Sequence, residues 1–116
     1  MEQELRRSEK RRQLIYYLKA FRSDTGELLG HVVNITHNGI MVLARKPLEI
    51  GGGVALRIAL PFEHEGKTDI HMTVESRWHR KDVNPQYFLT GFQVVAVDRA
   101  DVGTIDYLID ECAFQG

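Results

Sequence analysis

The segment from Ile70 to His79 alternates between apolar and polar residues more regularly than any other part of this chain. The intervening positions are His, Thr, Glu, Arg and His. Because side chains of a β-strand point alternately to opposite faces, the pattern predicts a strand with one buried and one wet side. The residues expected to share the buried side are Ile70, Met72, Val74, Ser76 and Trp78.

Five further segments, rich in aliphatic and aromatic residues, are predicted to be short strands: 14–21, 28–35, 40–44, 54–60 and 87–97. Turns are expected at residues 23–26, 36–39 and 63–67. Pro61 is expected to end the fourth of the six strands, because proline donates no hydrogen bond to a sheet. Gly91, inside the last strand, predicts a bulge or the close approach of another segment.

The end of the chain predicts a helix over residues 98–113. Asp98 is a suitable N-cap, and Asp101 would lie near the positive end of the helix dipole. An apolar stripe recurs at helical spacing, made of Val102, Ile105, Leu108, Ile109 and Cys112. For a chain of 116 residues, these elements predict a single mainly β domain, a six-stranded antiparallel β-barrel with a C-terminal helix packed on it.

Composition limits the classes of function. With 43% hydrophobic and 27% charged residues, the chain is typical of a globular protein. No apolar run approaches the roughly 20 residues of a membrane-spanning helix, so we expect a cytoplasmic location and no membrane insertion. The single cysteine, Cys112, excludes an internal disulfide and is expected to be a small core residue.

The net charge of −1 conceals a basic segment near the N-terminus. Residues 5–12 contain five Lys or Arg against one Glu, so the rest of the chain is net acidic. We expect residues 1–12 to form a flexible basic arm and residues 13–116 to form the barrel with its helix. Cations concentrated on one short arm suit a compact anionic ligand better than a nucleic acid.

Two short motifs connect this arm to the turn at residues 36–39. Arg7 to Arg11 has the form RxxxR, and Asn34 to Gly39 has the form NxTxxG. The pair resembles the signature of the PilZ family, RxxxR followed at roughly two dozen residues by [D/N]xSxxG. The resemblance implies a six-stranded barrel and a bacterial receptor for cyclic di-GMP, with no enzymatic activity and no cofactor.

The resemblance also implies the ligand-binding residues. Arg7 and Arg11 would contact phosphates and guanine, for which the planar guanidinium is suited, while Asn34, Thr36 and Gly39 would hold the other side of the ligand. The family usually has Ser in place of Thr36 and more commonly Asp in place of Asn34. Both departures predict weaker affinity, unless the added methyl of threonine only stiffens the strand.

The register of the arginines is open. Counting back from Asn34 by the commonest spacing favours Arg12, with Ser8 in the first position, and Arg6 with Lys10 is a third pair. We take Arg7 and Arg11 as the pair and Arg12 as an additional contact. The weaker candidates are Arg6, His37 within the turn, and Trp78, which can stack on a base if it does not pack in the core.

Other chemistry has little support. The five histidines form no HxH pair, no helical HxxxH pair and no pair with cysteine, so no metal site is expected. No nucleophile with a base and an oxyanion hole is recognisable, so we do not expect an enzyme.

Three functions are therefore compared. The first is a cyclic di-GMP receptor whose arm becomes ordered on binding, and whose signal leaves through an unidentified protein partner or through a change such as homodimer formation. The second is a protein-interaction module of the same fold that binds no nucleotide. The third, a barrel for single-stranded nucleic acid, is disfavoured because the barrel residues are net acidic and lack an interleaved basic and aromatic surface.

Overall fold

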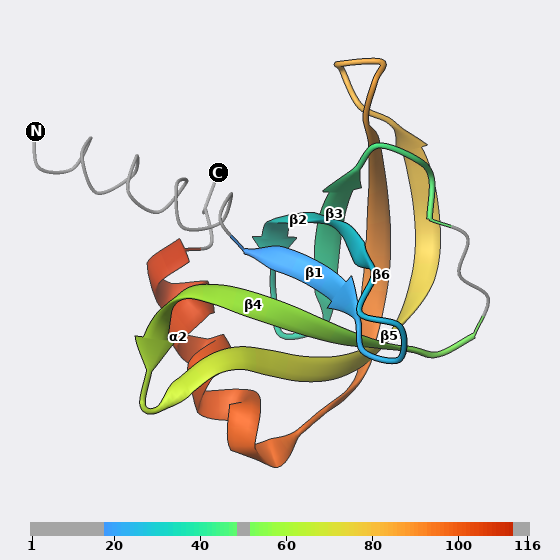
Figure 1. Cartoon of the computed structure of the whole chain (residues 1–116). Helices are drawn as coiled ribbons and strands as arrows, with labels where there is room; N and C mark the ends of the chain where they lie inside the picture. The colour runs from blue at the N-terminus through green and yellow to red at the C-terminus, as the bar shows by residue number, and fades with distance from the viewer. Residues whose placement is uncertain (1–17, 49–51, 113–116) are drawn as a thin grey trace, which may run out of the picture.

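The computed structural model describes residues 18–48 and 52–112, with the side chains of residues 111 and 112 outside the description. Six strands close into an antiparallel barrel in the order β1-β2-β3-β6-β5-β4 (Figure 1). The predicted barrel with its C-terminal helix is thereby confirmed. The strands are β1 (Lys19–Arg22), β2 (Leu28–Ile35), β3 (Gly39–Ala44), β4 (Val54–His64), β5 (Lys67–Lys81) and β6 (Phe88–Val97).

The core fills the inside of the barrel with side chains from alternate strand positions. Because one face of each strand is buried, the register is fixed, and the opposite face carries the residues available for binding. Ile70, Met72 and Val74 are buried as the alternation predicted. Other members of the core include Ala20, Val32, Ile40, Val42, Leu56, Ile58 and Phe92.

The C-terminal helix begins with a short 3₁₀ turn, η1 (Arg99–Asp101), and continues as α2 (Val102–Cys112). Asp98 is the predicted N-cap, since its carboxylate accepts a hydrogen bond from the Ala100 N–H at 3.1 Å. Ile105 and Leu108 are buried in the core, whereas Val102 is exposed, contrary to the predicted stripe. The 3₁₀ turn changes the rotation per residue, so the apolar face begins one turn later. The side chain of Cys112, predicted to be a small core residue, lies outside the described residues.

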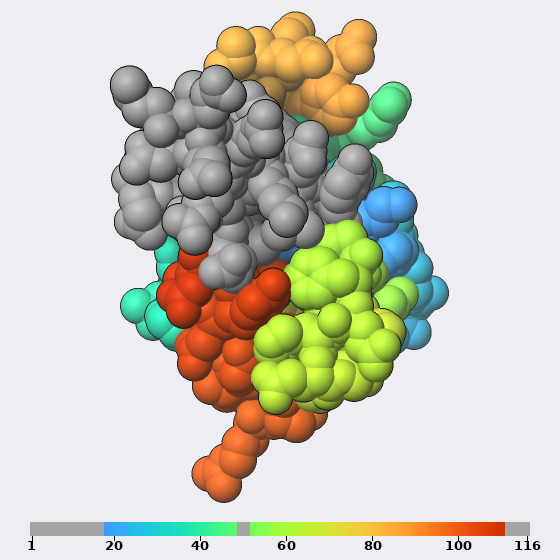
Figure 2. Space-filling model, turned by 90° about the vertical axis from the view of Figure 1, so that its left-hand side faces the viewer, coloured from blue at the N-terminus to red at the C-terminus, as the bar shows by residue number. Residues whose placement is uncertain are grey.

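The hairpin between β4 and β5 lies beside α2 on one face of the molecule (Figure 2). Pro61 was expected to end β4, but the strand continues to His64. The regular pairing with β5 stops at Ala59 and resumes only at His64, so Pro61 does not have to donate a hydrogen bond to the neighbouring strand. The turn is also shorter than the expected 63–67. It consists of Glu65 and Gly66, both with positive φ, as a two-residue hairpin turn requires.

Trp78 lies on the outside of the barrel, so the prediction that it packs in the core is wrong. The register between β5 and β6 shifts between Ser76 and Trp78, and the extra residue reverses the faces that follow it. Trp78 then pairs with Gly91 and is 42% exposed. The close approach predicted at Gly91 is confirmed, since a Cβ there would lie 2.3 Å from Trp78 Cε2.

The first strand closes the barrel by pairing with both β2 and β4. The prediction for this strand was residues 14–21, of which 14–17 lie outside the described residues, as does the whole predicted arm. The bounds of β2 are those predicted, and β3 and β6 differ by one residue. No helix in the described ranges is long and apolar enough to cross a membrane.

Candidate functional site

The turn between β2 and β3 has its shape fixed by Thr36. Its hydroxyl oxygen accepts hydrogen bonds from the N–H groups of Gly39 at 3.0 Å and Asn38 at 3.3 Å. The Thr36 N–H donates to the Gly39 carbonyl at 2.9 Å, and the Val94 N–H of β6 donates to the Asn38 carbonyl at 2.8 Å. The turn is therefore held both internally and against β6, as is usual for threonine in reverse turns.

A cavity of about 350 Å³, here called the motif pocket, lies against this turn. It brings together residues from β2, β3, β5 and β6 on the outer side of the barrel, where Met41, Gly91 and Trp78 are cross-strand neighbours. Four predicted site residues line it: Asn34, Thr36, Gly39 and Trp78. The remaining lining residues are Asn38, Ile40, Met41, Arg77, Gly91, Phe92 and Gln93.

The indole of Trp78 forms an apolar wall of the motif pocket. Three of its ring atoms lie within 2.6 Å of the position that a Cβ would occupy at Gly91, so only glycine admits the ring here. The guanidinium of Arg80 lies 5.4 Å from the ring centroid. Since the ring remains partly exposed, a planar ligand group has access to it.

Arg77 was missed as a site residue by the sequence analysis, although it is the one charged residue among the described residues that line the motif pocket. Its guanidinium donates a hydrogen bond to Gln93 Oε1 and lies 3.6 Å from Glu75. The side chain is 56% exposed, so much of its hydrogen-bonding capacity faces solvent. Its position next to Trp78 in the sequence could have indicated it as a site residue. The expected alternation of the strand instead placed Arg77 and Trp78 on opposite faces.

His37 belongs to the turn but does not line the motif pocket. Its Nε2 lies 2.7 Å from Asp106 Oδ1 on α2, and both side chains are exposed. His37 therefore connects the turn to the helix. The arginine candidates Arg6, Arg7, Arg11 and Arg12 lie outside the described residues.

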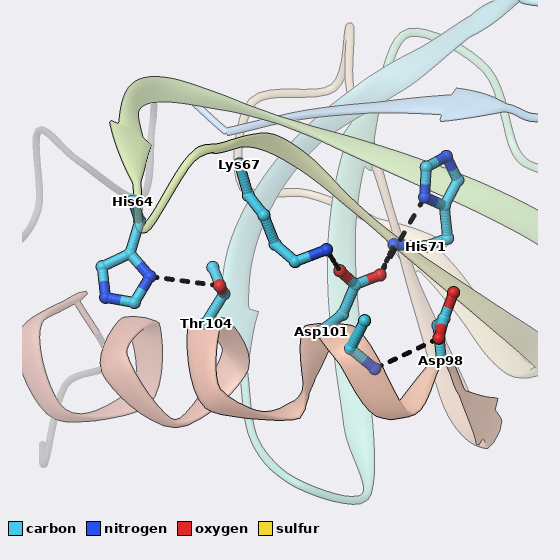
Figure 3. A network of polar contacts seen from close by, with 7 residues as sticks. His64, Lys67, His71, Asp98, Asp101 and Thr104 are labelled. Atoms are coloured by element: carbon cyan, nitrogen blue, oxygen red, sulfur yellow. Dashed lines mark hydrogen bonds and ion pairs between the residues drawn. The ribbon is translucent and has the colours of Figure 1, made fainter.

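A second polar cluster anchors the start of the C-terminal helix (Figure 3). The side chain of Asp101 is only 2% exposed, and its Oδ1 lies 2.8 Å from Lys67 Nζ. Its Oδ2 accepts a hydrogen bond from the backbone N–H of His71 at 2.8 Å, while His64 Nδ1 lies 3.1 Å from Thr104 Oγ1. The hydrogen bond to Asp101 raises the pKa of Lys67 above its ordinary value.

We call Asp101, Lys67 and His71 the Asp101 cluster. Both carboxylate oxygens of Asp101 are already engaged by groups of β5, so the cluster joins the helix to the barrel and leaves no free carboxylate for chemistry. Within residues 18–48 and 52–112, no group of three or more His, Cys, Asp or Glu residues is arranged to hold a metal ion.

Comparison with known proteins adds a family. Residues 5–111 match the family model described as PilZ domain. A solved structure of similar fold is the Bacillus subtilis inhibitor of motility (MotI/DgrA), with a TM-score of 0.64 and 21% sequence identity. The match covers 80% of this chain and 46% of that chain, so this chain spans less than half of that protein's length. No curated protein matches the sequence.

Proposed function

This chain belongs to the PilZ domain family, and from that premise we propose that it is a receptor for cyclic di-GMP that signals through a protein partner. The family is one of receptor and effector domains for this nucleotide rather than enzymes. One observation carries the proposal for this chain. Asn34, Thr36 and Gly39 of the motif line a single pocket with Arg77 and Trp78, more distant in sequence.

The chemistry of the motif pocket suits the nucleotide. Cyclic di-GMP carries two phosphodiester charges and two guanines, so its site needs cations, donors and acceptors for the guanine edge, and a flat apolar surface. Arg77 offers a fork for phosphate or for guanine O6 and N7. The amide of Asn34 can both donate and accept, and Trp78 offers a ring on which a purine can stack.

The arm completes the proposed site. Residues 1–12 would supply Arg7 and Arg11 to the phosphates and guanine, with Arg12 as an additional contact and Arg6 as a weaker candidate. The described pocket would then hold one side of the nucleotide and the arm the other. Placing the arm over the barrel on binding would change the surface that a partner meets, in the bacterial cytoplasm where we expect the protein to act.

The threonine in the motif supports the proposal. The hydroxyl of Thr36 accepts the hydrogen bonds that hold the turn, and serine, the usual residue of the family, has the same hydroxyl. Threonine in place of the usual serine therefore keeps the hydroxyl that holds the turn. At Asn34 the loss of negative charge remains, and we expect it to reduce affinity relative to aspartate.

The proposal is tested by isothermal titration of the full chain with cyclic di-GMP, using Arg11→Ala, Asn34→Ala and the control Arg99→Ala. Arg99 is exposed in η1 and does not line the motif pocket. Losing a charge-assisted contact of roughly 1.5–3 kcal/mol should weaken binding about 10- to 150-fold for Arg11→Ala. Unchanged affinity for Arg11→Ala would remove that residue from the site. No heat from the folded wild type would favour an interaction module that binds no nucleotide.

A further inference from the structure

A second and larger cavity, of about 560 Å³, lies at the other end of β3. We call it the Tyr87 pocket. It is lined by residues 28–31 of β2, residues 43–46 at the end of β3, and Tyr87. It shares no lining residue with the motif pocket. The two are nevertheless close along one strand, because Met41 lines the first and Leu43 lines the second.

The Tyr87 pocket forms where β2 and β3 diverge. The two strands pair from Ile35 and Ile40 as far as His31 and Leu43. Gly30 passes so close to β3 that a Cβ there would lie 2.2 Å from the Leu43 carbonyl oxygen. Beyond this point the strands part, and apolar side chains are left on the outside of the barrel, with Leu28 49% exposed.

The rim of this pocket is cationic. Arg45 and Lys46 are both exposed, and the guanidinium of Arg45 lies 5.7 Å from the Tyr87 ring centroid. Lys46 Nζ lies 3.6 Å from Glu27 at the margin. Among the described residues that line the pocket none is acidic, although the whole chain has a net charge of −1. The pocket thus combines an apolar floor with local positive charge.

We propose that the Tyr87 pocket is the docking site for an acidic segment of the protein partner. One aliphatic or aromatic side chain of that segment would enter the apolar floor beside Leu28 and Leu43. A neighbouring carboxylate would meet Arg45 or Lys46. The inference rests on the proposed function, because the proposed receptor acts through a protein partner.

The charge and shape of the pocket favour this occupant over others. An apolar centre with a polar, charged rim is the usual anatomy of a protein interface, and charge complementarity selects an acidic partner over a basic one. Single-stranded nucleic acid requires a cationic groove with successive aromatic platforms, whereas this rim offers Arg45, Lys46 and one tyrosine. A pocket that orients a small ligand needs polar groups fixed in its interior. None of the polar side chains that line the Tyr87 pocket is buried.

The experiment uses the full chain and short fluorescent peptides rich in Asp and Glu with one central Leu, Phe or Trp. Matched peptides carry Ser in place of the apolar residue, or Lys in place of the acidic residues. Fluorescence anisotropy should detect binding of the acidic apolar peptides alone. The double variant Arg45→Glu, Lys46→Glu should weaken it roughly tenfold or more, because like charges then face each other.

The control reverses one exposed cation elsewhere, Arg99→Glu, and is compared with the single variants Arg45→Glu and Lys46→Glu, which have the same change in net charge. Arg99 does not line the Tyr87 pocket, so we expect less than about a threefold effect from its reversal. Amide chemical shifts of the labelled wild type should change at residues 28–31, 43–46 and 87 on peptide addition. Absence of peptide binding, an equal loss in the control, or shifts centred on residues 36–39 would overturn the inference.

Cyclic di-GMP titration of the same proteins separates this inference from the proposed function. The Arg45→Glu, Lys46→Glu variant should keep its nucleotide affinity within about threefold, because its substitutions lie outside the motif pocket and surface charges there act only at a distance. Nucleotide binding without peptide binding would overturn the docking site alone. Peptide binding at the Tyr87 pocket without nucleotide binding would contradict the receptor function and keep the docking site.

Discussion

The motif pocket and the Asp101 cluster are both polar sites assembled from distant segments, yet their side chains are used differently. In the cluster, a carboxylate that is 2% exposed has both oxygens engaged by Lys67 and the His71 backbone. In the pocket, Arg77 and Trp78 keep about half of their surface exposed. Polar groups satisfied within the fold hold the fold together, whereas those left accessible remain available to a ligand.

The physical reason for this contrast is desolvation. A buried carboxylate is tolerated only with partners that replace its water, so the Asp101 cluster is part of folding itself. The exposed groups of the motif pocket have lost little hydration, and a ligand can still exchange that water for direct contacts. Substitutions in the first site should therefore change stability, and substitutions in the second should change binding.

The largest effect is expected for Asp101→Ala. The variant loses an ion pair with Lys67 and leaves the His71 N–H without its acceptor, and we expect a loss of about 2–4 kcal/mol in the free energy of unfolding. Urea denaturation measures this loss. The affinity of the remaining folded protein for cyclic di-GMP should be unchanged, since Asp101 does not line the motif pocket.

Asp106→Ala is the matched control, because Asp106 is an exposed carboxylate of the same helix, paired only with an exposed histidine. We expect less than about 1 kcal/mol from its loss. A stable Asp101→Ala protein that had lost nucleotide binding would reverse the distinction between the two sites.

Trp78→Ala should have the opposite profile. Stacking of a base on an aromatic side chain contributes roughly 1–2 kcal/mol, so affinity for cyclic di-GMP should fall about 5- to 30-fold. Stability should change much less than in Asp101→Ala, because the ring is already partly exposed. Isothermal titration and urea denaturation of one preparation give both values. The control is Val95→Ala, because Val95 is likewise exposed but lies on β6 and does not line the motif pocket.

Thr36→Val tests whether the turn is preformed for the ligand. Valine keeps the volume of threonine but removes the hydroxyl that accepts from Gly39 and Asn38. We expect affinity to fall about 3- to 10-fold, in line with a hydrogen bond of roughly 1 kcal/mol. Thr36→Ser keeps the hydroxyl and should bind at least as well as the wild type. A loss of affinity in Thr36→Ser but not in Thr36→Val would assign the effect to the methyl group instead.

The smallest effect concerns pH. Because the pKa of Lys67 is raised above its ordinary 10.5 in the folded state, its contribution to stability is fully present below that value. It is lost as pH rises through the higher pKa of the folded protein. Urea denaturation across the alkaline range should show this loss in the wild type and not in Lys67→Met. The ammonium is one-third exposed, so solvent screening keeps the effect small.

Local patterns predicted most of the barrel but not the details that shape the motif pocket. Period-two alternation and turn residues suffice to place β2, and the apolar residues Ile70, Met72 and Val74 face inward as expected. The position of Trp78 depends instead on a register shift against β6, which the sequence of β5 alone does not encode. The same applies to Pro61, whose tolerance depends on an interruption in its pairing with β5.

The candidate site was predictable where it rests on a contiguous motif. Asn34, Thr36 and Gly39 are close in sequence, and they line one pocket. Arg77 was missed because its place follows from the fold of β5 on β6, and Lys67 and Asp101 meet only because the β4–β5 hairpin packs beside α2. The role of the four arm arginines stays a prediction, which the Arg11→Ala titration tests.

The pairing of β3 with β6 has a consequence for biosynthesis. Gly39 lies opposite Gln93 and Met41 opposite Gly91, so β6 supplies one side of the motif pocket. A nascent chain whose β6 is still inside the ribosome therefore has the turn at residues 36–39 but lacks the complete pocket. If cyclic di-GMP binds the motif pocket as proposed, it recognises only chains in which β6 has joined the barrel. By mass action it would stabilise completed barrels and leave truncated translation products, which lack the pocket, exposed to proteolysis.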